Sequence, residues 1–164
     1  MSAREEGSED VPPRRLERLP SWLTNTVARS AQRLVADALA QEGARRQHFV
    51  VLTALAEQGA ASQAALGRRL WIDRSDLHAI LNELERDGLV ARIRDEGDRR
   101  RNLVQLTPAG VAALKRLDAR VEAAQEALLE PLSARERREL RRLLKRLVDH
   151  HGNPPHAAPA RGRD

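Results

Sequence analysis

The chain of 164 residues lacks cysteine entirely and has little aromatic content, with two tryptophans and one phenylalanine. The absence of cysteine excludes disulfides, thiolate zinc sites, cysteine nucleophiles and thiol-based redox sensing. No stretch approaches the run of about 20 apolar residues that crosses a bilayer, and no apolar segment follows the charged start. We therefore expect a cytoplasmic protein with neither a membrane span nor a secretory signal.

Residue clusters typical of enzymes are also missing. The five histidines are His48, His78, His150, His151 and His156. None lies near a serine-rich elbow or a glycine-rich phosphate loop, and no cluster of histidine and carboxylate residues has zinc-ligand spacing. The pair of histidines after Asp149 could chelate adventitious metal, but we interpret it as a solvated helix end. We expect no enzymatic activity and no cofactor.

Lysine is scarce as well. The chain has 29 basic and 24 acidic side chains, a net charge of +5, yet Lys115 and Lys145 are its only lysines. Arginine presents a planar fork that suits phosphate groups and guanine edges. A GC-rich coding bias would explain the abundance of arginine equally well, so the positions of the arginines, and not their number, carry the functional argument.

The ends of the chain differ in composition from its middle. Residues 1–19 mix glutamate, arginine and proline with little apolar material, and residues 151–164 are rich in proline, alanine and glycine. We expect a flexible N-terminal arm and a disordered tail. Residues 20–150 are long enough for one domain with a real core.

Apolar residues at helical spacing predict that most of this domain is α-helical. A first helix starts near Pro20 and Ser21, which we interpret as its N-cap, and ends before Gly43; a second ends at Gly59. Two further helices follow: a short one with Ser62 as N-cap, and one with Asp73 as N-cap and Asp76 as its capping-box partner. A long helix then runs from Thr107 and Pro108 to Pro131. The last helix opens with a capping box of Ser133 and Glu136.

One segment between the helices has strand character. Residues 89–95 and 101–107 are short, apolar and partly alternating, and residues 96–100 between them contain Gly97. This pattern predicts a two-stranded hairpin, which must pack on helices to be stable. A short helix, a tight turn, a second helix and then a β-hairpin form a winged helix-turn-helix. We therefore expect a mainly α fold with a small β-hairpin and a DNA-binding lobe at about 46–107.

Two surfaces of this lobe are candidates for contacting DNA. The second helix of a helix-turn-helix enters the major groove and presents its early outward residues to base edges. The leucines of that helix occupy one face, which leaves Arg74, Ser75, His78 and Asn82 outward, while Ser62 and Gln63 start the short helix and could hold a phosphate. The alternative is that these residues form only the solvated face of an amphipathic helix.

The hairpin tip supplies the second surface. Asp98, Arg99, Arg100 and Arg101 lie side by side there. Adjacent arginines repel one another, and a phosphate partner relieves that cost, so we expect the tip to reach the minor groove or flanking phosphates. We expect Asp98 to orient Arg100 through a local salt bridge. A solvated loop without a partner is the alternative.

The stretch from residue 81 to 110 resembles the MarR family of regulators. The matching residues are Leu84, Glu85, Gly88 and Leu89 before the hairpin, Asp98 and Arg100 at its tip, and Leu106, Thr107 and Gly110 after it. The resemblance extends from about Ser21 to His150. It implies a homodimer whose terminal helices, at about 21–41 and 108–150, interleave, and which binds palindromic operators in double-stranded DNA, usually to repress. The apolar stripes of those helices lie too far from the winged-helix core for one subunit to bury them.

The same resemblance implies a small anionic or aromatic effector that binds between the dimer helices and the DNA-binding lobe. Trp22 and Asp73 resemble residues of the urate-responsive branch, whose sensing arginine would be Arg92 or Arg94 here, and His48 is a further candidate for the cleft wall. Alternatively, Trp22 anchors the dimer interface and Asp73 is only a helix cap. Trp71 lies in the predicted turn, where we expect it to fill a packing gap.

A different class of function also fits the winged helix. Arginines at a hairpin tip are compatible with an architectural DNA-binding protein that has no sequence preference, or with a winged helix that binds protein. Specific binding that persists against excess non-operator DNA would separate the regulator from these alternatives.

Overall fold

A computed structural model describes residues 13–95, 97 and 102–151 of the chain. Its elements are α1 (Arg14–Glu17), α2 (Pro20–Ala40), α3 (Arg46–Gln58), β1 (Ala61–Ser62), α4 (Gln63–Leu70), α5 (Arg74–Arg86), β2 (Val90–Arg94), β3 (Asn102–Leu106), α6 (Pro108–Leu128) and α7 (Ala134–His151). The mainly helical winged helix-turn-helix predicted from the sequence is therefore confirmed. No helix in these described ranges is both long and apolar enough to span a bilayer.

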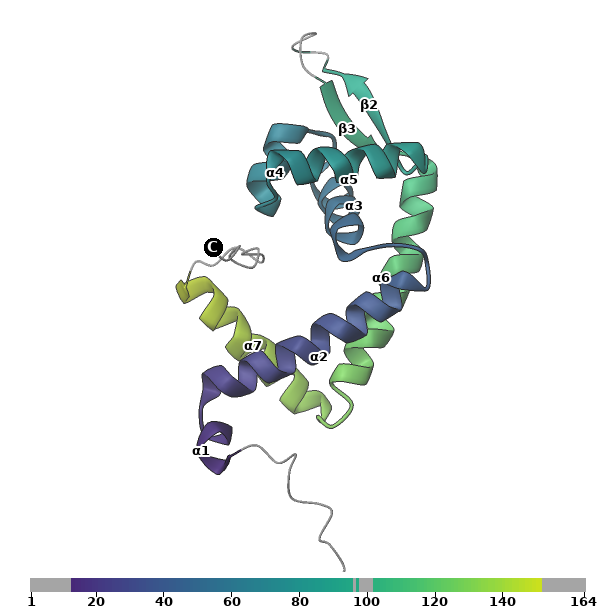
Figure 1. Cartoon of the computed structure of the whole chain (residues 1–164). Helices are drawn as coiled ribbons and strands as arrows, with labels where there is room; N and C mark the ends of the chain where they lie inside the picture. The colour runs from purple at the N-terminus through teal and green to yellow at the C-terminus, as the bar shows by residue number, and fades with distance from the viewer. Residues whose placement is uncertain (1–12, 96, 98–101, 152–164) are drawn as a thin grey trace, which may run out of the picture.

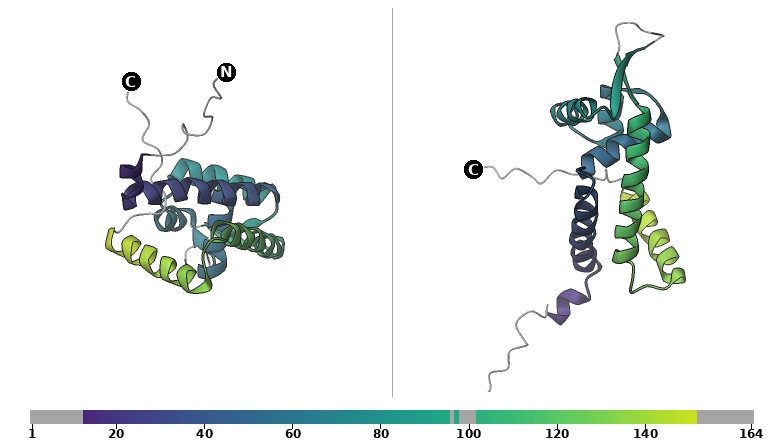
Figure 2. Two further views of the ribbon diagram at one scale, coloured as in Figure 1. Left: turned by 90° about the horizontal axis from the view of Figure 1, so that it is seen from below. Right: turned by 90° about the vertical axis from the view of Figure 1, so that its right-hand side faces the viewer.

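The elements form two regions joined by α6. Figure 1 shows α3, α4, α5 and the small sheet at one end, and α2 and α7 at the other. Helix α6 starts at the sheet and then runs alongside α2, as Figure 2 shows from the side. The core of the first region is leucine-rich, and Leu39 from the end of α2 also reaches it. Its fully buried side chains are Leu39, Val51, Leu52, Leu66, Leu77, Leu81 and Leu84.

The sheet has three strands in the order β1-β3-β2, all antiparallel. The predicted hairpin is β2 and β3, in a register that pairs Val90 with Leu106 and Arg94 with Asn102. The two-stranded prediction is wrong in one respect, because Ala61 in β1 pairs with Val104. A strand of two residues is too short to leave an alternating pattern. Its role is to attach the hairpin to the start of α4, with Ala61 and Val104 both buried.

Several predicted helix ends need correction. Leu19, and not Ser21, is the N-cap of α2, and Pro20 is the first helical residue. Asp73 is the N-cap of α5, but its side chain accepts no capping hydrogen bond, so the predicted capping box with Asp76 is wrong. The one-turn helix α1 lies inside the segment predicted to be a flexible arm.

Two other predicted caps are confirmed. The Ser62 hydroxyl accepts a hydrogen bond from the Ala65 amide at 3.2 Å. The Ser133 amide donates to Glu136 Oε2 at 2.8 Å, and the Glu136 amide donates to the Ser133 hydroxyl at 3.4 Å. These bonds satisfy amides at helix starts that have no partner within the helix. The tail was predicted to begin at residue 151, but His151 is the last residue of α7, and residues 152–164 lie outside the described part of the chain.

The terminal helices leave apolar side chains uncovered. On α2, Leu23 and Val27 are exposed; on α7, the exposed apolar side chains are Leu143, Leu144, Leu147 and Val148, and no residue of α7 is buried. A helix stabilised in water normally buries its apolar stripe. The stripes predicted to lie too far from the core are therefore not buried within a single chain.

The start of α6 is anchored to the turn between α5 and β2. The Thr107 hydroxyl donates to the Gly88 carbonyl at 2.7 Å and accepts from the Gly110 amide at 3.0 Å, while the Thr107 amide donates to the Leu89 carbonyl at 3.1 Å. A Cβ atom on Gly110 would lie 2.0 Å from the Leu89 carbonyl oxygen. Only glycine allows this approach of the two backbones.

A second link joins the loop before α3 to α6. The two carboxylate oxygens of Glu42 accept hydrogen bonds from Arg116 Nε and Arg120 Nε, each at 3.1 Å. The Glu42 side chain is only 19% exposed. The hydrogen bond from Arg120, followed by that from Arg116, holds the pKa of Glu42 below its ordinary value. This pair of bonds fixes the loop that leads into α3 against α6.

We expect Gly110→Ala to lower the free energy of unfolding by about 2–3 kcal/mol, because overlap of the new methyl group with backbone outweighs the better helix propensity of alanine. Urea denaturation followed by circular dichroism measures this. In the control Gly97→Ala, the nearest atom, Asp95 Oδ1, would lie 3.5 Å from the new Cβ, an ordinary contact. Equal stability of the Gly110 variant and the wild type would contradict the anchor.

We expect Glu42→Gln to lower the melting temperature at pH 7, and the difference from wild type to shrink as the pH falls below about 4.5. A carboxylate whose pKa is lowered by folding contributes stability above its unfolded-state pKa, and this contribution is lost as the folded group protonates. Thermal melts of both proteins between pH 7 and pH 3 test this. A difference that is independent of pH would rule out a role for the Glu42 charge.

Candidate nucleic-acid interface

Helix α5 has one buried and one exposed face. Its buried side chains are Leu77, Ile80, Leu81 and Leu84, which pack in the core of the lobe. The four residues predicted to face DNA, Arg74, Ser75, His78 and Asn82, are all exposed. The leucine spacing that predicted a helix thus also determines which polar side chains are available to a partner.

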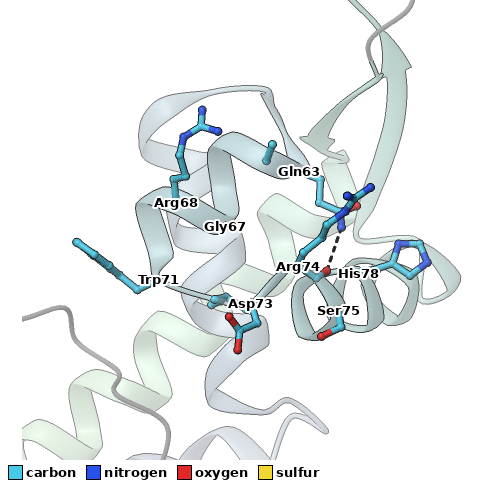
Figure 3. A pocket seen from close by; sticks show the side chains of 10 residues that line it. Gln63, Gly67, Arg68, Trp71, Asp73, Arg74, Ser75 and His78 are labelled. Atoms are coloured by element: carbon cyan, nitrogen blue, oxygen red, sulfur yellow. Dashed lines mark hydrogen bonds between the residues drawn. The ribbon is translucent and has the colours of Figure 1, made fainter.

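An open groove lies between α4 and α5 (Figure 3). It brings Gln63 from the start of α4 together with Arg74, Ser75 and His78 from the first turns of α5. Gln63 Nε2 donates to the Arg74 carbonyl oxygen at 3.3 Å, which ties the two helix starts together. Arg68 also lines the groove and is exposed. Nothing in the sequence pattern distinguished this arginine from other surface arginines.

Ser62 lies beside this groove but has a structural role. Its hydroxyl oxygen caps α4, and its side chain is half-buried. The predicted phosphate contact by Ser62 would have to share the hydroxyl with this cap. Gln63, the next residue, is therefore the better-placed polar group at the start of α4.

Trp71 differs from the prediction that it fills a packing gap. It is the C-cap of α4, its backbone is left-handed with φ of 55°, and it is 57% exposed. Figure 3 shows its ring directed away from α5. The left-handed backbone at this position turns the side chain outward, and the partly buried Ile72 packs against the core in its place.

Asn82 belongs to a network that connects α5 to the hairpin. Arg92 on β2 donates to Asn82 Oδ1 at 2.8 Å and forms an ion pair with Glu85. On its other side, Asn82 Nδ2 lies 3.1 Å from His78 Nε2. Arg92 was predicted as a candidate for effector sensing. The sequence did not reveal its contact with Asn82, because the two residues lie on different elements.

The hairpin tip carried the second predicted DNA contact. Asp98, Arg99, Arg100 and Arg101 lie outside the described residues, as does the expected salt bridge of Asp98. The strands that lead to the tip are described, and Figure 1 shows that they extend away from the helices. Arg94, the last residue of β2, is exposed and pairs in register with Asn102.

His48 is the one buried polar residue in the described core, at 8% exposed. Its Nε2 lies 2.8 Å from Glu83 Oε2, and its Nδ1 accepts a hydrogen bond from the Arg45 amide at 3.4 Å. Arg45 also pairs with Glu83. The hydrogen bond from His48, and then that from Arg45, lower the pKa of Glu83 from its ordinary value. This cluster joins the start of α3 to α5.

The five candidate effector residues do not converge within one chain. Asp73 lines a second depression, on another flank of α5, whose wall includes Arg45 and Glu83, the partners of His48. Trp22 lies on α2, outside this depression and partly buried. Arg92 and Arg94 lie on β2. His48 and Asp73 are therefore the two members that share one part of the lobe.

Comparison with known proteins gives consistent matches. Residues 42–101 match the model of the MarR family. A transcriptional regulatory protein for the hcr operon of Thauera aromatica is 35% identical over 114 residues, which are 70% of this chain and 69% of that protein. The transcriptional repressor Rv2887 of Mycobacterium tuberculosis is 34% identical over 113 residues, 69% of this chain and 81% of the repressor.

Solved structures match over most of the chain. Rv2887 in complex with DNA superposes with a TM-score of 0.69 at 29% identity, covering 79% of this chain and 97% of that one. The PcaV regulator of Streptomyces coelicolor, in complex with its natural ligand, has a TM-score of 0.68 at 28% identity, covering 85% and 98%. With its groove between α4 and α5 and its projecting hairpin, this chain belongs to the MarR family of DNA-binding transcriptional regulators.

Proposed function

We propose that the protein acts as a homodimeric repressor that binds a palindromic operator and is released by a small anionic or aromatic ligand. The observation that carries this proposal is the exposed polar face of α5, which shares one groove with the start of α4 on a winged-helix scaffold. Arg74 lies at the first turn of α5, where its fork can bind a guanine edge or a phosphate. Ser75 and His78 add hydrogen-bonding groups in the same groove.

Uncovered apolar side chains on the terminal helices support a dimer. Leu23 and Val27 on α2 and Leu147 and Val148 on α7 are about half exposed. Pairing two copies through these helices removes the side chains from water. A two-fold dimer places its α5 helices on half-sites about one helical turn, or ~10 bp, apart, which requires an inverted repeat in the DNA.

A ligand response is supported by the depression beside α5. This depression is lined by Arg45 and by Asp73 at the start of α5, so an anion bound at Arg45 would lie against the helix that reads DNA. A ligand can shift the dimer away from the DNA-binding geometry only by its difference in affinity for the two states. The PcaV structure, which holds its natural ligand, shows that ligand binding occurs in a regulator of this fold.

Selection of duplexes from a random pool by the purified protein tests the function directly. We expect an inverted repeat to be enriched and to be bound at least 10³-fold more tightly than scrambled DNA. Gel shifts with excess non-operator DNA measure this ratio. A ratio near one would favour an architectural DNA-binding protein, and no binding to duplex DNA in dilute buffer would favour a winged helix that binds protein.

The hairpin contact makes a prediction about salt. We expect Arg100→Ala to weaken binding to all duplexes about equally and to reduce the slope of log affinity against log salt concentration by about one, because one phosphate contact is lost. The control Arg138→Ala removes the same charge from an exposed site on α7. An Arg100→Ala protein with wild-type affinity at several salt concentrations would refute the predicted contact.

The dimer makes a second prediction. We expect Leu147→Glu to convert the protein to a monomer and to abolish tight operator binding, because a charge would be buried in an apolar interface. Light scattering after size-exclusion chromatography gives the mass. Lys115→Glu introduces the same side chain at an exposed site on α6 and should leave the dimer intact. A dimeric Leu147 variant would exclude this face of α7 from the interface.

The effector makes a third prediction. At about 100 times its dissociation constant, a true ligand stabilises the protein by about 2.7 kcal/mol. We expect at least one of urate, salicylate or a tricarboxylate to raise the melting temperature and to release DNA in a gel shift, and we expect Arg45→Met to reduce both effects. If none of these compounds changes either measurement, the proposed class of effector is wrong.

A further inference from the structure

We infer that His78 donates a hydrogen bond from Nδ1 to the N7 atom of a purine in the operator, and that Arg92 and Asn82 determine this polarity. Asn82, on this reading, is a positioning residue and not itself a reader of a base. The inference rests on the proposed function, since it concerns how α5 recognises DNA. It also gives Arg92 a role in DNA recognition, whereas the sequence suggested effector sensing.

The orientation of the Asn82 amide follows from Arg92. A guanidinium group has only hydrogen-bond donors. The Asn82 atom that lies 2.8 Å from Arg92 must therefore be the carbonyl oxygen. Arg92 is itself held by its ion pair with Glu85, and its side chain is only 30% exposed. The opposite amide orientation would place the NH₂ group against the guanidinium, with donors facing donors.

The protonation of His78 follows from Asn82. With its oxygen directed at Arg92, Asn82 presents the NH₂ group to His78 Nε2 at 3.1 Å. An NH₂ group can only donate, so Nε2 must offer a lone pair and the proton of the neutral ring must reside on Nδ1. Within residues 13–95, 97 and 102–151, no protein group hydrogen-bonds to Nδ1. A single directed donor is left for a partner outside the chain.

The chemistry of the major groove identifies that partner. His78 lines the groove between α4 and α5, beside Arg74 and Ser75 (Figure 3). Purine N7, guanine O6 and thymine O4 are acceptors in the major groove, whereas cytosine N4 and adenine N6 are donors. A lone donor at this position therefore binds one of the acceptors, and N7 is the acceptor that both purines present. Asn82 uses its oxygen on Arg92 and its nitrogen on His78, so it lacks the free pair of groups that a bidentate contact to adenine requires.

The first test measures the tautomer of His78 by two-bond ¹H–¹⁵N correlation spectra of the full-length protein at pH 8, with the signals assigned by comparison with His78→Gln. We expect the Nδ1–H tautomer in the wild type. We expect Asn82→Leu and Arg92→Met to shift His78 toward the Nε2–H tautomer that predominates in free imidazole side chains. A wild-type His78 in the Nε2–H form would overturn the inference. Asn82 is exposed, so Asn82→Leu keeps the test valid if Arg92→Met fails to fold.

The second test uses the duplex that the wild type selects, with 7-deazapurines placed at one position of each half-site at a time. At one position, we expect the 7-deaza base to weaken wild-type binding about 3- to 10-fold, as for the loss of one hydrogen bond. His78→Ala should show no further loss there, Asn82→Leu should show a reduced loss, and Arg74→Ala should show the full loss. Selection of no sequence would refute the proposed function, whereas a selected sequence with no purine N7 coupled to His78 would refute only this inference.

Discussion

The contact between the start of α6 and the turn after α5 is the constraint on which the arrangement of this protein depends. Thr107 bonds to Gly88 and Leu89 on one side and caps α6 on the other, and Gly110 lets the two backbones meet. Helix α6 then runs beside α2 and leads to α7 (Figure 2). This junction, together with the bonds from Arg116 and Arg120 to Glu42, holds α5 and the sheet in place relative to α2 and α6.

Around α5, polar contacts act in three directions. Gln63 joins the start of the helix to α4, Glu83 joins its C-terminal part to His48 and Arg45, and Asn82 joins its exposed face to Arg92 on the hairpin. The side chains of His48, Glu83 and Arg92 are largely removed from water, where polar groups are costly unless they are paired, so these pairs favour one position of the helix.

If His78 contacts a purine as inferred above, the exposed residues of α5 have two different roles. Among the residues that the structure describes, no partner uses the Arg74 guanidinium or His78 Nδ1, and the proposed function assigns both to DNA. Asn82 is used on both sides by Arg92 and His78, and it orients its neighbour. A polar residue on the outward face of a recognition helix is thus not necessarily a reader of bases. The Asn82 side chain can only be assigned once the atoms around it are known.

The sequence by itself determined the order of the helices, the hairpin, the capping by Ser62 and Ser133, and the face of α5 that carries Arg74 and His78. These features depend on side-chain spacing and local hydrogen bonds, which are encoded over a few residues. The tertiary structure decided the third strand at Ala61, the outward position of Trp71, the cluster of His48 with Glu83 and the contact between Arg92 and Asn82. These features join residues distant in sequence or depend on a single backbone angle, and no short-range pattern records such pairings.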